Sequence, residues 1–237
     1  GIAAVNDVTM TLGEHQITAL IGPNGAGKTT IFNLITGTLT PDRGRVLLRN
    51  VDITGKAPNA VANLGMARSF QDVRLFPQLT ALQNVAMAVP NQPGENVAAL
   101  ALQPIRCRRA EAQVRAEAMR CLALTGMADR AEERVANLGY GEQKLVAIAR
   151  LLATEADVLL LDEPTSGIDP ASLDEMIGLV LRLKELGRTI CIVEHSLTVV
   201  ERLADHVVFM EEGTVTAEGT IDELTRQERL VEVYFGT

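Results

Sequence analysis

The 237-residue sequence lacks the features that mark membrane-embedded, secreted or nucleic-acid-binding proteins. No apolar run approaches the roughly 20 residues that a transmembrane helix needs, and no signal peptide is present. The three cysteines are odd in number and have no metal-site spacing, which indicates reduced thiols in a cytosolic protein. Basic residues number 22 against 30 acidic ones, for a net charge of −8, which argues against a general nucleic-acid binder. Internal repeats and low-complexity segments are also absent, and 47% apolar residues are enough for a substantial core.

A glycine-rich segment near the start of the chain fits the phosphate-loop pattern G-x-x-x-x-G-K-[ST]. The residues before it, 16–21 (QITALI), are typical of a short buried strand, and apolar residues recur at helical spacing after it. A strand, a glycine-rich turn and a helix direct backbone N–H groups and the positive helix end at one point, which suits a polyphosphate. We therefore expect Lys28 to contact the β- and γ-phosphates of a nucleotide and the Thr29 hydroxyl to bind Mg²⁺. The segment consists of Gly22, Pro23, Asn24, Gly25, Ala26, Gly27, Lys28, Thr29 and Thr30.

Apolar strand-like segments alternate with helical segments in the C-terminal half of the chain. Residues 158–161 (VLLL) and 189–193 (TICIV) are short and apolar, as buried parallel strands are. Between them, Asp169 and Pro170 have the residue types of a helix N-cap and first turn. A hairpin is expected over residues 206–217. This order predicts an α/β domain with a mostly parallel central sheet.

The N-terminal part predicts further strands, some of them antiparallel. Val8, Met10 and Leu12 alternate with polar residues, as in a half-buried antiparallel strand, and residues 45–49 and 65–70 also read as strands. We therefore expect an antiparallel β part beside the parallel sheet.

Residues 72–136 predict helices and loops without a convincing strand. A long helix is expected over residues 106–125, with Gly126 at the position of a C-terminal cap. We interpret this block as a helical subdomain inserted into a nucleotide-binding core of residues 1–71 and 137–237, the whole forming a single domain.

Polar side chains that could act on a bound nucleotide follow the predicted strands. Asp162 and Glu163 come directly after residues 158–161, and His195 follows the next strand. Since ligands bind at the carboxyl ends of parallel strands, these side chains are expected to face the phosphate loop. Asp162 would hold Mg²⁺, Glu163 would activate or orient the attacking water, and His195 would sense the γ-phosphate. Gln71 closes a predicted strand at the junction with the helical block. The alternative is an ordinary solvated strand end, a structural histidine and a surface glutamine.

A second glycine-containing segment, residues 138–143 (LGYGEQ), precedes a predicted helix over residues 142–154. Glycines followed by a helix start form a potential anion site. The alternative is a loop that only caps the helix.

Taken together, these motifs resemble those of ABC-transporter ATPases, in the same order and over essentially the whole chain. The motifs are the phosphate loop, Gln71, residues 138–143, residues 158–164 (VLLLDEP), residues 166–169 (SGID) and His195. The resemblance implies a P-loop NTPase fold and two cassettes packed head to tail, with each ATP between one phosphate loop and the partner's signature. It also implies that Asp162 is the Walker B aspartate, Glu163 the catalytic glutamate, His195 the switch histidine and Asp169 the D-loop residue. Gln71 would contact the metal and couple the nucleotide to membrane subunits.

Finer features are similar to the ATPases of branched-chain amino-acid importers. These features are residues 69–80 (SFQDVRLFPQLT), Tyr140 in the signature and the ending 231–236 (VEVYFG). The resemblance implies a homo- or heterodimer of ATPases under two permease subunits on the cytoplasmic face of the membrane. A periplasmic binding protein would deliver the substrate. The cofactors would be ATP and Mg²⁺, and the adenine-stacking aromatic of the family is expected upstream of Gly1.

The signature departs from the family pattern at two positions. Gly139 stands where most members have a serine whose hydroxyl reaches the partner's γ-phosphate, and Glu142 replaces the usual glutamine. Together with Tyr140 and Gly141, these residues are the expected contacts to the partner's nucleotide. A hydrogen bond to a charged group contributes about 1.5–3 kcal/mol, so this composite site is expected to be the weaker one of an asymmetric pair.

Other functions stay open from sequence alone. A lipopolysaccharide-export ATPase shares the compact single cassette but normally keeps Ser-Gly-Gly in the signature. ABC ATPases outside transport typically carry coiled-coil insertions, zinc motifs or tandem cassettes, which this sequence does not have. A nucleotide-binding subunit with little hydrolysis is disfavoured by Lys28, Asp162, Glu163 and His195, although Gly139 leaves it open.

Overall fold

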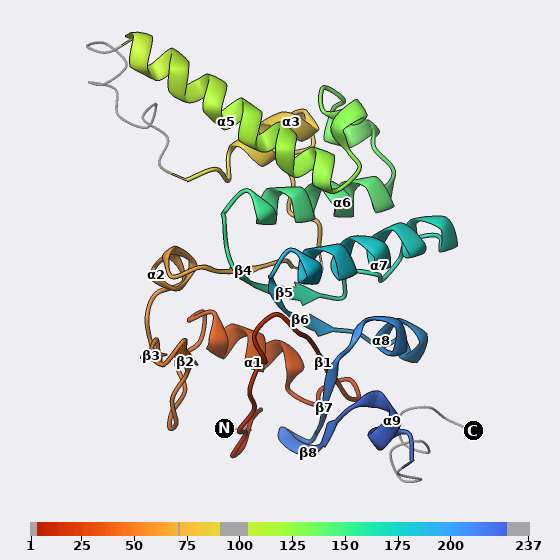
Figure 1. Cartoon of the computed structure of the whole chain (residues 1–237). Coiled ribbons are helices and arrows are strands. Elements are labelled where there is room, and N and C mark those ends of the chain that lie inside the picture. Colours follow the sequence, from red (N-terminus) through yellow and green to blue (C-terminus); the bar gives the residue numbers. More distant parts are fainter. Residues whose placement is uncertain (1–3, 71, 91–103, 227–237) are drawn as a thin grey trace. The chain divides into compact units, whose positions relative to one another are not determined.

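The computed structural model describes residues 4–70, 72–90 and 104–226, and the chain divides into two compact units (Figure 1). The first unit draws on residues 1–71, 157–166 and 173–237. The second draws on residues 72–156 and 167–172. The helical subdomain predicted over residues 72–136 stays a prediction, and the second unit extends beyond it, to residue 156.

The first unit is built on a six-stranded sheet with the order β4-β5-β6-β1-β7-β8. Strands β4 to β7 in this order run parallel, and β8 is antiparallel to β7. Every residue of β1 and β5 is buried, as expected for strands covered on both faces. This arrangement confirms the predicted α/β class and mostly parallel sheet. The strands are β1 (Ile17–Ile21), β4 (Met66–Arg68), β5 (Val158–Asp162), β6 (Thr189–Val193), β7 (His206–Glu211) and β8 (Thr214–Gly219).

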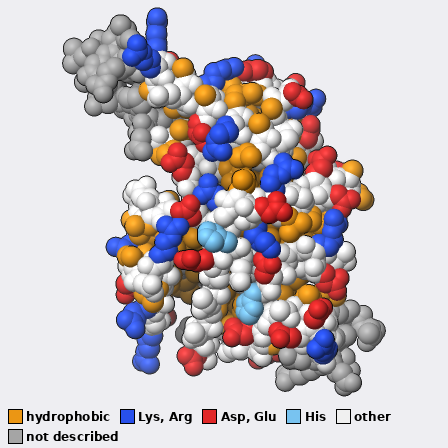
Figure 2. All heavy atoms as spheres, in the orientation of Figure 1, with side chains coloured by type: hydrophobic (Ala, Val, Ile, Leu, Met, Phe, Trp, Pro, Cys, Tyr) orange, Lys and Arg blue, Asp and Glu red, His pale blue; other side chains and the backbone are white. Residues whose placement is uncertain are grey.

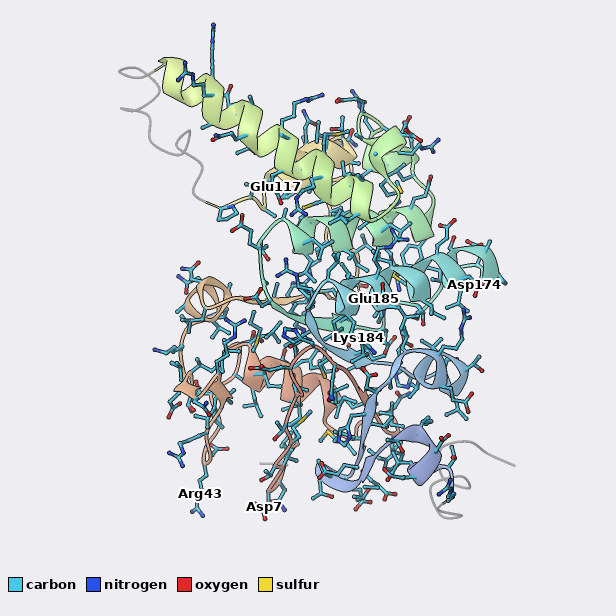
Figure 3. The ribbon with its side chains drawn as sticks, in the orientation of Figure 1. Asp7, Arg43, Glu117, Asp174, Lys184 and Glu185 are labelled. Atoms are coloured by element: carbon cyan, nitrogen blue, oxygen red, sulfur yellow. The ribbon has the colours of Figure 1, made fainter. Side chains whose placement is uncertain are left out.

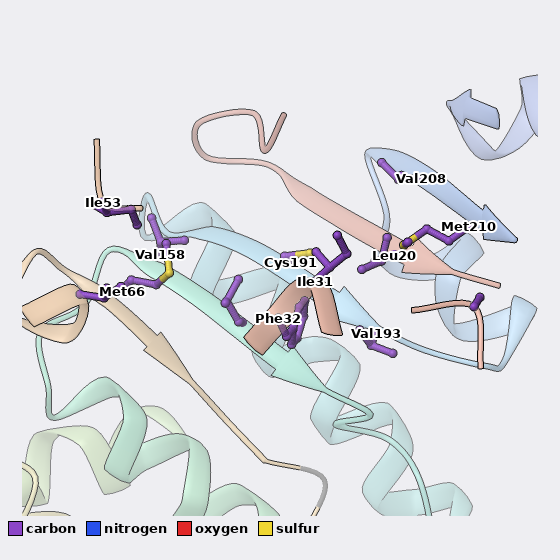
Figure 4. Close-up of a cluster of buried hydrophobic side chains, with 13 residues drawn as sticks. Leu20, Ile31, Phe32, Ile53, Met66, Val158, Cys191, Val193, Val208 and Met210 are labelled. Atoms are coloured by element: carbon purple, nitrogen blue, oxygen red, sulfur yellow. The ribbon is translucent and has the colours of Figure 1, made fainter. Parts of the chain in front are cut away.

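Helix α1 (Lys28–Ile35) packs on one face of this sheet through a cluster of buried apolar side chains (Figure 4). Phe32 lies at its centre and is fully buried. The cluster alternates along each strand, for example at Leu160 but not at Leu159, because successive side chains point to opposite faces. Leu159 is buried as well, so both faces of the sheet are covered. The other elements of this unit are β2 (Leu47–Leu48), β3 (Val51–Asp52), α2 (Pro58–Asn63), α8 (Leu197–Leu203), α9 (Ile221–Leu224) and most of α7 (Pro170–Glu185).

The second unit is helical, as residues 72–136 predicted. Thr80 and Gln83 form a capping box that begins α3, and α3, α5 and α6 pack together through buried side chains such as Val85, Leu122 and Ile148. Gly126, with φ 75°, follows α5 as its sequence position indicated. In the described part of this unit, an isolated bridge between Thr80 and Arg134 is the only strand-like pairing. Its helices are α3 (Ala81–Ala86), α5 (Pro104–Leu124), α6 (Tyr140–Leu152), η2 (Ala128–Arg130) and η3 (Val135–Asn137).

One predicted strand is absent from the structure, the antiparallel part is shorter than expected, and one helix was not predicted. Residues 8–12 form no strand, because Val8, Met10 and Leu12 alternate to pack against the α1 cluster without a hydrogen-bonded neighbour strand. The antiparallel part is instead the short pair β2–β3, with Leu48 opposite Val51. Helix α8 was not predicted, since it is only seven residues long. Within the described ranges, no helix is both long and apolar enough to cross a membrane.

The burial of Cys191 in β6 makes a testable prediction. Complete burial raises the pKa of this thiol to about 12, and the negative charge of Asp162 adds to the effect. Since the thiolate is the reactive form, roughly one molecule in ten thousand would carry it at pH 8. We expect peptide mapping after alkylation of the native protein to find Cys191 unmodified, whereas alkylation in denaturant modifies it fully. Equal labelling in both conditions would contradict this burial.

Candidate functional site

The phosphate-loop residues form a turn between β1 and α1 that requires glycine. Gly22, Gly25 and Gly27 all have positive φ, at 147°, 83° and 102°. A Cβ on Gly22 would lie 2.0 Å from the carbonyl oxygen of Met210, and one on Gly27 would lie 2.5 Å from that of Ala4. Only glycine fits both the conformation and the space at these two positions. The loop is therefore packed closely against the chain around it.

Lys28, the first residue of α1, is held inside this turn. Its Nζ donates hydrogen bonds to the carbonyl oxygens of Gly22 at 2.7 Å and Pro23 at 3.0 Å. Burial lowers the pKa of Lys28, and the charges of Glu163 and Asp162 partly oppose that shift. A buried ammonium whose hydrogen bonds go to neutral carbonyls suits a charged oxygen ligand such as a phosphate.

The rest of the loop is anchored and its helix end is accessible. The Gly213 N–H, from the turn between β7 and β8, donates to the Ala26 carbonyl at 3.1 Å. Asn24 and Thr29 are exposed, and Thr30 is half-buried. The Thr29 hydroxyl is thus accessible at the start of α1.

Two carboxylates stand at the carboxyl end of β5, as predicted. Asp162 is the last residue of the strand and is buried, and its register partner on β6 is Val193. Arg68 of β4 pairs with it, with Nη2 2.8 Å from Asp162 Oδ2. The sequence reasoning did not identify Arg68; a lone arginine within the apolar segment 65–70 was the available signal.

Glu163 and His195 meet across the neighbouring strand ends. The Oε1 atom of Glu163 lies 2.9 Å from His195 Nε2. Glu163 has φ 48°, a left-handed conformation that is uncommon for a residue with a Cβ, and its N–H donates to the Val193 carbonyl at 2.9 Å. Backbone strain of this kind costs about 1–3 kcal/mol and is concentrated at functional sites. The 2.9 Å contact shows that these two residues are close together, as their places at one edge of the sheet predicted.

Glu194 is a second residue that the sequence reasoning did not single out. It is buried, and its Oε1 accepts hydrogen bonds from the Thr165 N–H at 3.0 Å and the Thr165 hydroxyl at 2.7 Å. These bonds connect the end of β6 to the turn that follows Glu163. Glu194 thereby braces the strained segment that carries the carboxylate.

The signature residues lie in the second unit, at the start of α6. Gly139 is the N-cap, and its N–H donates to Glu142 Oε2 at 2.8 Å. Tyr140 is partly exposed and packs beside Gly167, where an added Cβ would lie 3.2 Å from the ring. A Cβ on Gly141 would lie 2.8 Å from the Ser172 hydroxyl oxygen, so this glycine is also needed for close packing. The helix start is thus ordered, with the Gly139 N–H bonded to the side chain of Glu142.

Asp169 caps α7, as its position in the sequence indicated. Its carboxylate accepts hydrogen bonds from the Ala171 and Ser172 N–H groups, each at 3.1 Å, and from the Ser172 hydroxyl at 2.6 Å. The Ser172 hydrogen bonds lower the pKa of Asp169.

The first unit therefore brings together the phosphate loop, Asp162, Glu163 and His195. Gly139, Tyr140, Gly141, Glu142 and Asp169 belong to the second unit. Gln71 and residues 231–236 lie outside the described residues, so their predicted roles are untested.

Comparisons with known proteins agree with this description. Residues 5–166 match the model of a family described as "ABC transporter". The high-affinity branched-chain amino acid transport ATP-binding protein LivG of Salmonella typhimurium is 35% identical over 237 residues, covering 100% of this chain and 93% of that protein.

Two solved structures extend the likeness to the fold. A nucleotide-free ATP-binding cassette from an ABC transporter superposes with a TM-score of 0.84 at 32% identity, covering 99% of this chain and 93% of that one. A dimeric cassette in a post-hydrolysis state, bound to ADP and Pi, superposes with a TM-score of 0.74 at 26% identity, covering 92% and 90%.

The close approach at Gly22 can be tested with a matched pair of alanine substitutions. Gly25→Ala adds a Cβ to open space, so only backbone strain of about 1–3 kcal/mol is expected. Gly22→Ala adds backbone strain at φ 147°, farther from the conformations open to alanine than φ 83° at Gly25, and also forces the loop away from the Met210 carbonyl. We expect Gly22→Ala to lower the free energy of unfolding in urea distinctly more than Gly25→Ala. Equal losses would show that the loop moves freely at Gly22.

Proposed function

The chain belongs to the ABC transporter family, and from this membership we propose that it is the ATP-hydrolysing subunit of an importer for branched-chain or related amino acids. The LivG relative, similar over the full length, supports the substrate class. The observation that carries the hydrolytic role is the Glu163–His195 pair next to a phosphate loop with an intact lysine.

In this proposal the phosphate loop binds the triphosphate. Backbone N–H groups and the start of α1 hold the phosphate oxygens, and Lys28 exchanges its carbonyl partners for the β- and γ-phosphates. The contributing residues are Gly22, Pro23, Asn24, Gly25, Ala26, Gly27, Thr29 and Thr30. Because Lys28 is already desolvated, little further desolvation accompanies this exchange.

Glu163 is the proposed general base. Its Oε1 would accept a proton from the attacking water or orient that water, and His195 keeps the carboxylate in one place through the 2.9 Å contact. His195 would also donate a hydrogen bond to the γ-phosphate. The strained backbone conformation of Glu163 would serve to direct its side chain from the strand end.

The residues at this site fit a magnesium ion. Mg²⁺ prefers oxygen ligands and is commonly held by one or two protein groups together with substrate phosphates. The Thr29 hydroxyl and the Asp162 carboxylate would supply these groups, with Gln71 as a third. The ion would neutralise charge on the phosphates during hydrolysis.

We further propose that the chain works as a dimer beneath two permease subunits, at the cytoplasmic face of the membrane, with a periplasmic binding protein delivering substrate. The dimeric cassette structure supports pairing. Gly139, Tyr140, Gly141, Glu142 and Asp169 would then face the nucleotide of the partner ATPase. In each unit, the face drawn in Figure 2 mixes acidic and basic side chains, which agrees with a protein partner rather than nucleic acid.

The catalytic assignment predicts the behaviour of Glu163→Gln. The amide keeps the size of the side chain but cannot accept the proton, so ATP turnover should fall about 10²–10⁴-fold while ATP binding persists. Light scattering in Mg²⁺ and ATP should show a stabilised dimer. Glu185→Gln, at an exposed residue that is the last of α7 (labelled in Figure 3), is the control and should hydrolyse ATP normally. Normal turnover in Glu163→Gln would exclude it as the base.

The segment around Phe76 is proposed to receive a permease helix, together with Leu75 and Pro77. Buried Asn84 fixes its backbone: Asn84 Oδ1 accepts the Phe76 N–H at 2.8 Å, and Nδ2 donates to the Phe76 carbonyl at 3.1 Å. The Phe76 residue nevertheless remains 50% exposed. A rigidly held, exposed aromatic residue is typical of an interface anchor.

Phe76→Ser should therefore weaken binding of the cassette to its permease while sparing ATP hydrolysis by the isolated chain. An anchor residue contributes about 2 kcal/mol or more, which corresponds to roughly thirtyfold in affinity. Co-purification and transport in the assembled importer measure the loss. Leu186→Ser, at a similarly exposed apolar residue of the first unit, is the control. A parallel loss of hydrolysis would show that Phe76 belongs to the core.

A further inference from the structure

Arg68 is a buried cation at the carboxyl end of β4. The side chains of Arg68 and Asp162 are each only 8% exposed. The Arg68 guanidinium donates from Nη2 to Asp162 Oδ2 at 2.8 Å and from Nη1 to Asn33 Oδ1 of α1 at 2.6 Å. Its central carbon lies 5.3 Å from the ring centroids of both Phe32 and Phe70. The planar group is thus fixed by one carboxylate, one amide and two aromatic rings.

Ser69, the next residue, holds the same aspartate through its backbone. Asp162 donates its N–H to Ser69 Oγ at 3.0 Å, and the Ser69 N–H donates to the Leu160 carbonyl at 2.8 Å. Two consecutive residues therefore hold the carboxylate and the main chain of Asp162. The end of β4 therefore fixes the position of the Asp162 side chain.

Stability alone is a weak explanation for such a pair. The free energy needed to desolvate two charges is about as large as the attraction between them. A buried ion pair is therefore weak evidence of net stabilisation. The geometry has a more specific consequence. Arg68 engages Oδ2 of Asp162, and among the described residues none donates a hydrogen bond to Oδ1. The carboxylate is held by one oxygen, with the other left for a further ligand.

We infer that Arg68 is a positioning residue. From the end of β4, it orients the Asp162 carboxylate for a magnesium ion. The inference rests on the proposed metal role of Asp162. Residues that orient a metal ligand from outside the coordination sphere typically change metal affinity 10–100-fold when they are substituted. Arg68 would do this without touching the ion or the nucleotide, through the fixed orientation of one carboxylate.

The test compares ATP affinity in Mg²⁺ with ATP affinity in EDTA for the purified full chain. The ratio of the two dissociation constants measures the coupling between metal and nucleotide, and this coupling is reciprocal. Arg68→Met removes the charge and the hydrogen bonds. Arg68→Lys keeps a cation for Asp162, so it should fold, but a single ammonium cannot reproduce the planar fork. Circular dichroism checks the fold of each variant.

Two further variants complete the design. Asp162→Asn tests the metal role itself. Arg188→Met is a control at the other end of the strand. Arg188 pairs with Asp157 at 2.7 Å, just before the opposite end of β5, in a more exposed pair in which Asp157 also binds Arg49. This control breaks an arginine–aspartate pair on the same sheet without touching the carboxyl edge.

We expect Arg68→Met to lower the Mg²⁺ preference about 10–100-fold, with ATP affinity in EDTA retained. Arg68→Lys should fall between this variant and the wild type, and Arg188→Met should match the wild type. If Asp162→Asn loses the Mg²⁺ preference but both Arg68 variants keep it, the inference is wrong and the proposed function stands. That judgement can rest on Arg68→Lys alone if Arg68→Met does not fold. If Asp162→Asn also keeps the Mg²⁺ preference, the proposed metal role of Asp162 is wrong, and the inference about Arg68 is wrong with it.

Discussion

The parallel sheet of the first unit is the constraint on which the site depends. Strands β1, β5 and β6 are covered on both faces, so polar groups can emerge only where the strands end. The register pairs Asp162 with Val193, which brings the residues after each strand together at one edge. The phosphate loop follows β1 at this same edge, since β1 is parallel to β6. Residues far apart in the sequence are therefore neighbours for a geometric reason.

This dependence explains what could be predicted from the sequence. The phosphate loop, the α/β class and the meeting of Glu163 with His195 follow from local patterns combined with the rule that parallel strand ends share an edge. Arg68 and Glu194 could not be found in this way, because their partners are set by side-chain packing between distant segments. The failed strand at residues 8–12 has a related cause. Alternation shows that Val8, Met10 and Leu12 face a core, but it does not show that a neighbouring strand supplies hydrogen bonds.

The two departures from the family pattern in the signature meet in one hydrogen bond. A serine hydroxyl is absent at Gly139, and the N–H of that residue donates to Glu142 instead of remaining open. A carboxylate is favourable at a helix N-terminus but is also a negative charge where an anion would bind. Arg130 lies 3.5 Å from Glu142 at a partly exposed position, where an ion pair contributes little. If this helix start binds a partner's nucleotide as proposed, both departures from the family pattern would act in the same direction, toward weaker phosphate binding.

Three charged groups of the site, Lys28, Asp162 and Glu163, share one property, which is that each has a partner within the protein. Lys28 is bonded to loop carbonyls, Asp162 to Arg68 and Glu163 to His195. An unpaired buried charge would be costly, so these contacts let the site fold before a nucleotide arrives. Nucleotide binding at such a site replaces existing partners with new ones. Its affinity therefore depends on the difference between two sets of contacts. The effect inferred for Arg68 has the same origin, because Arg68 is the existing partner of Asp162.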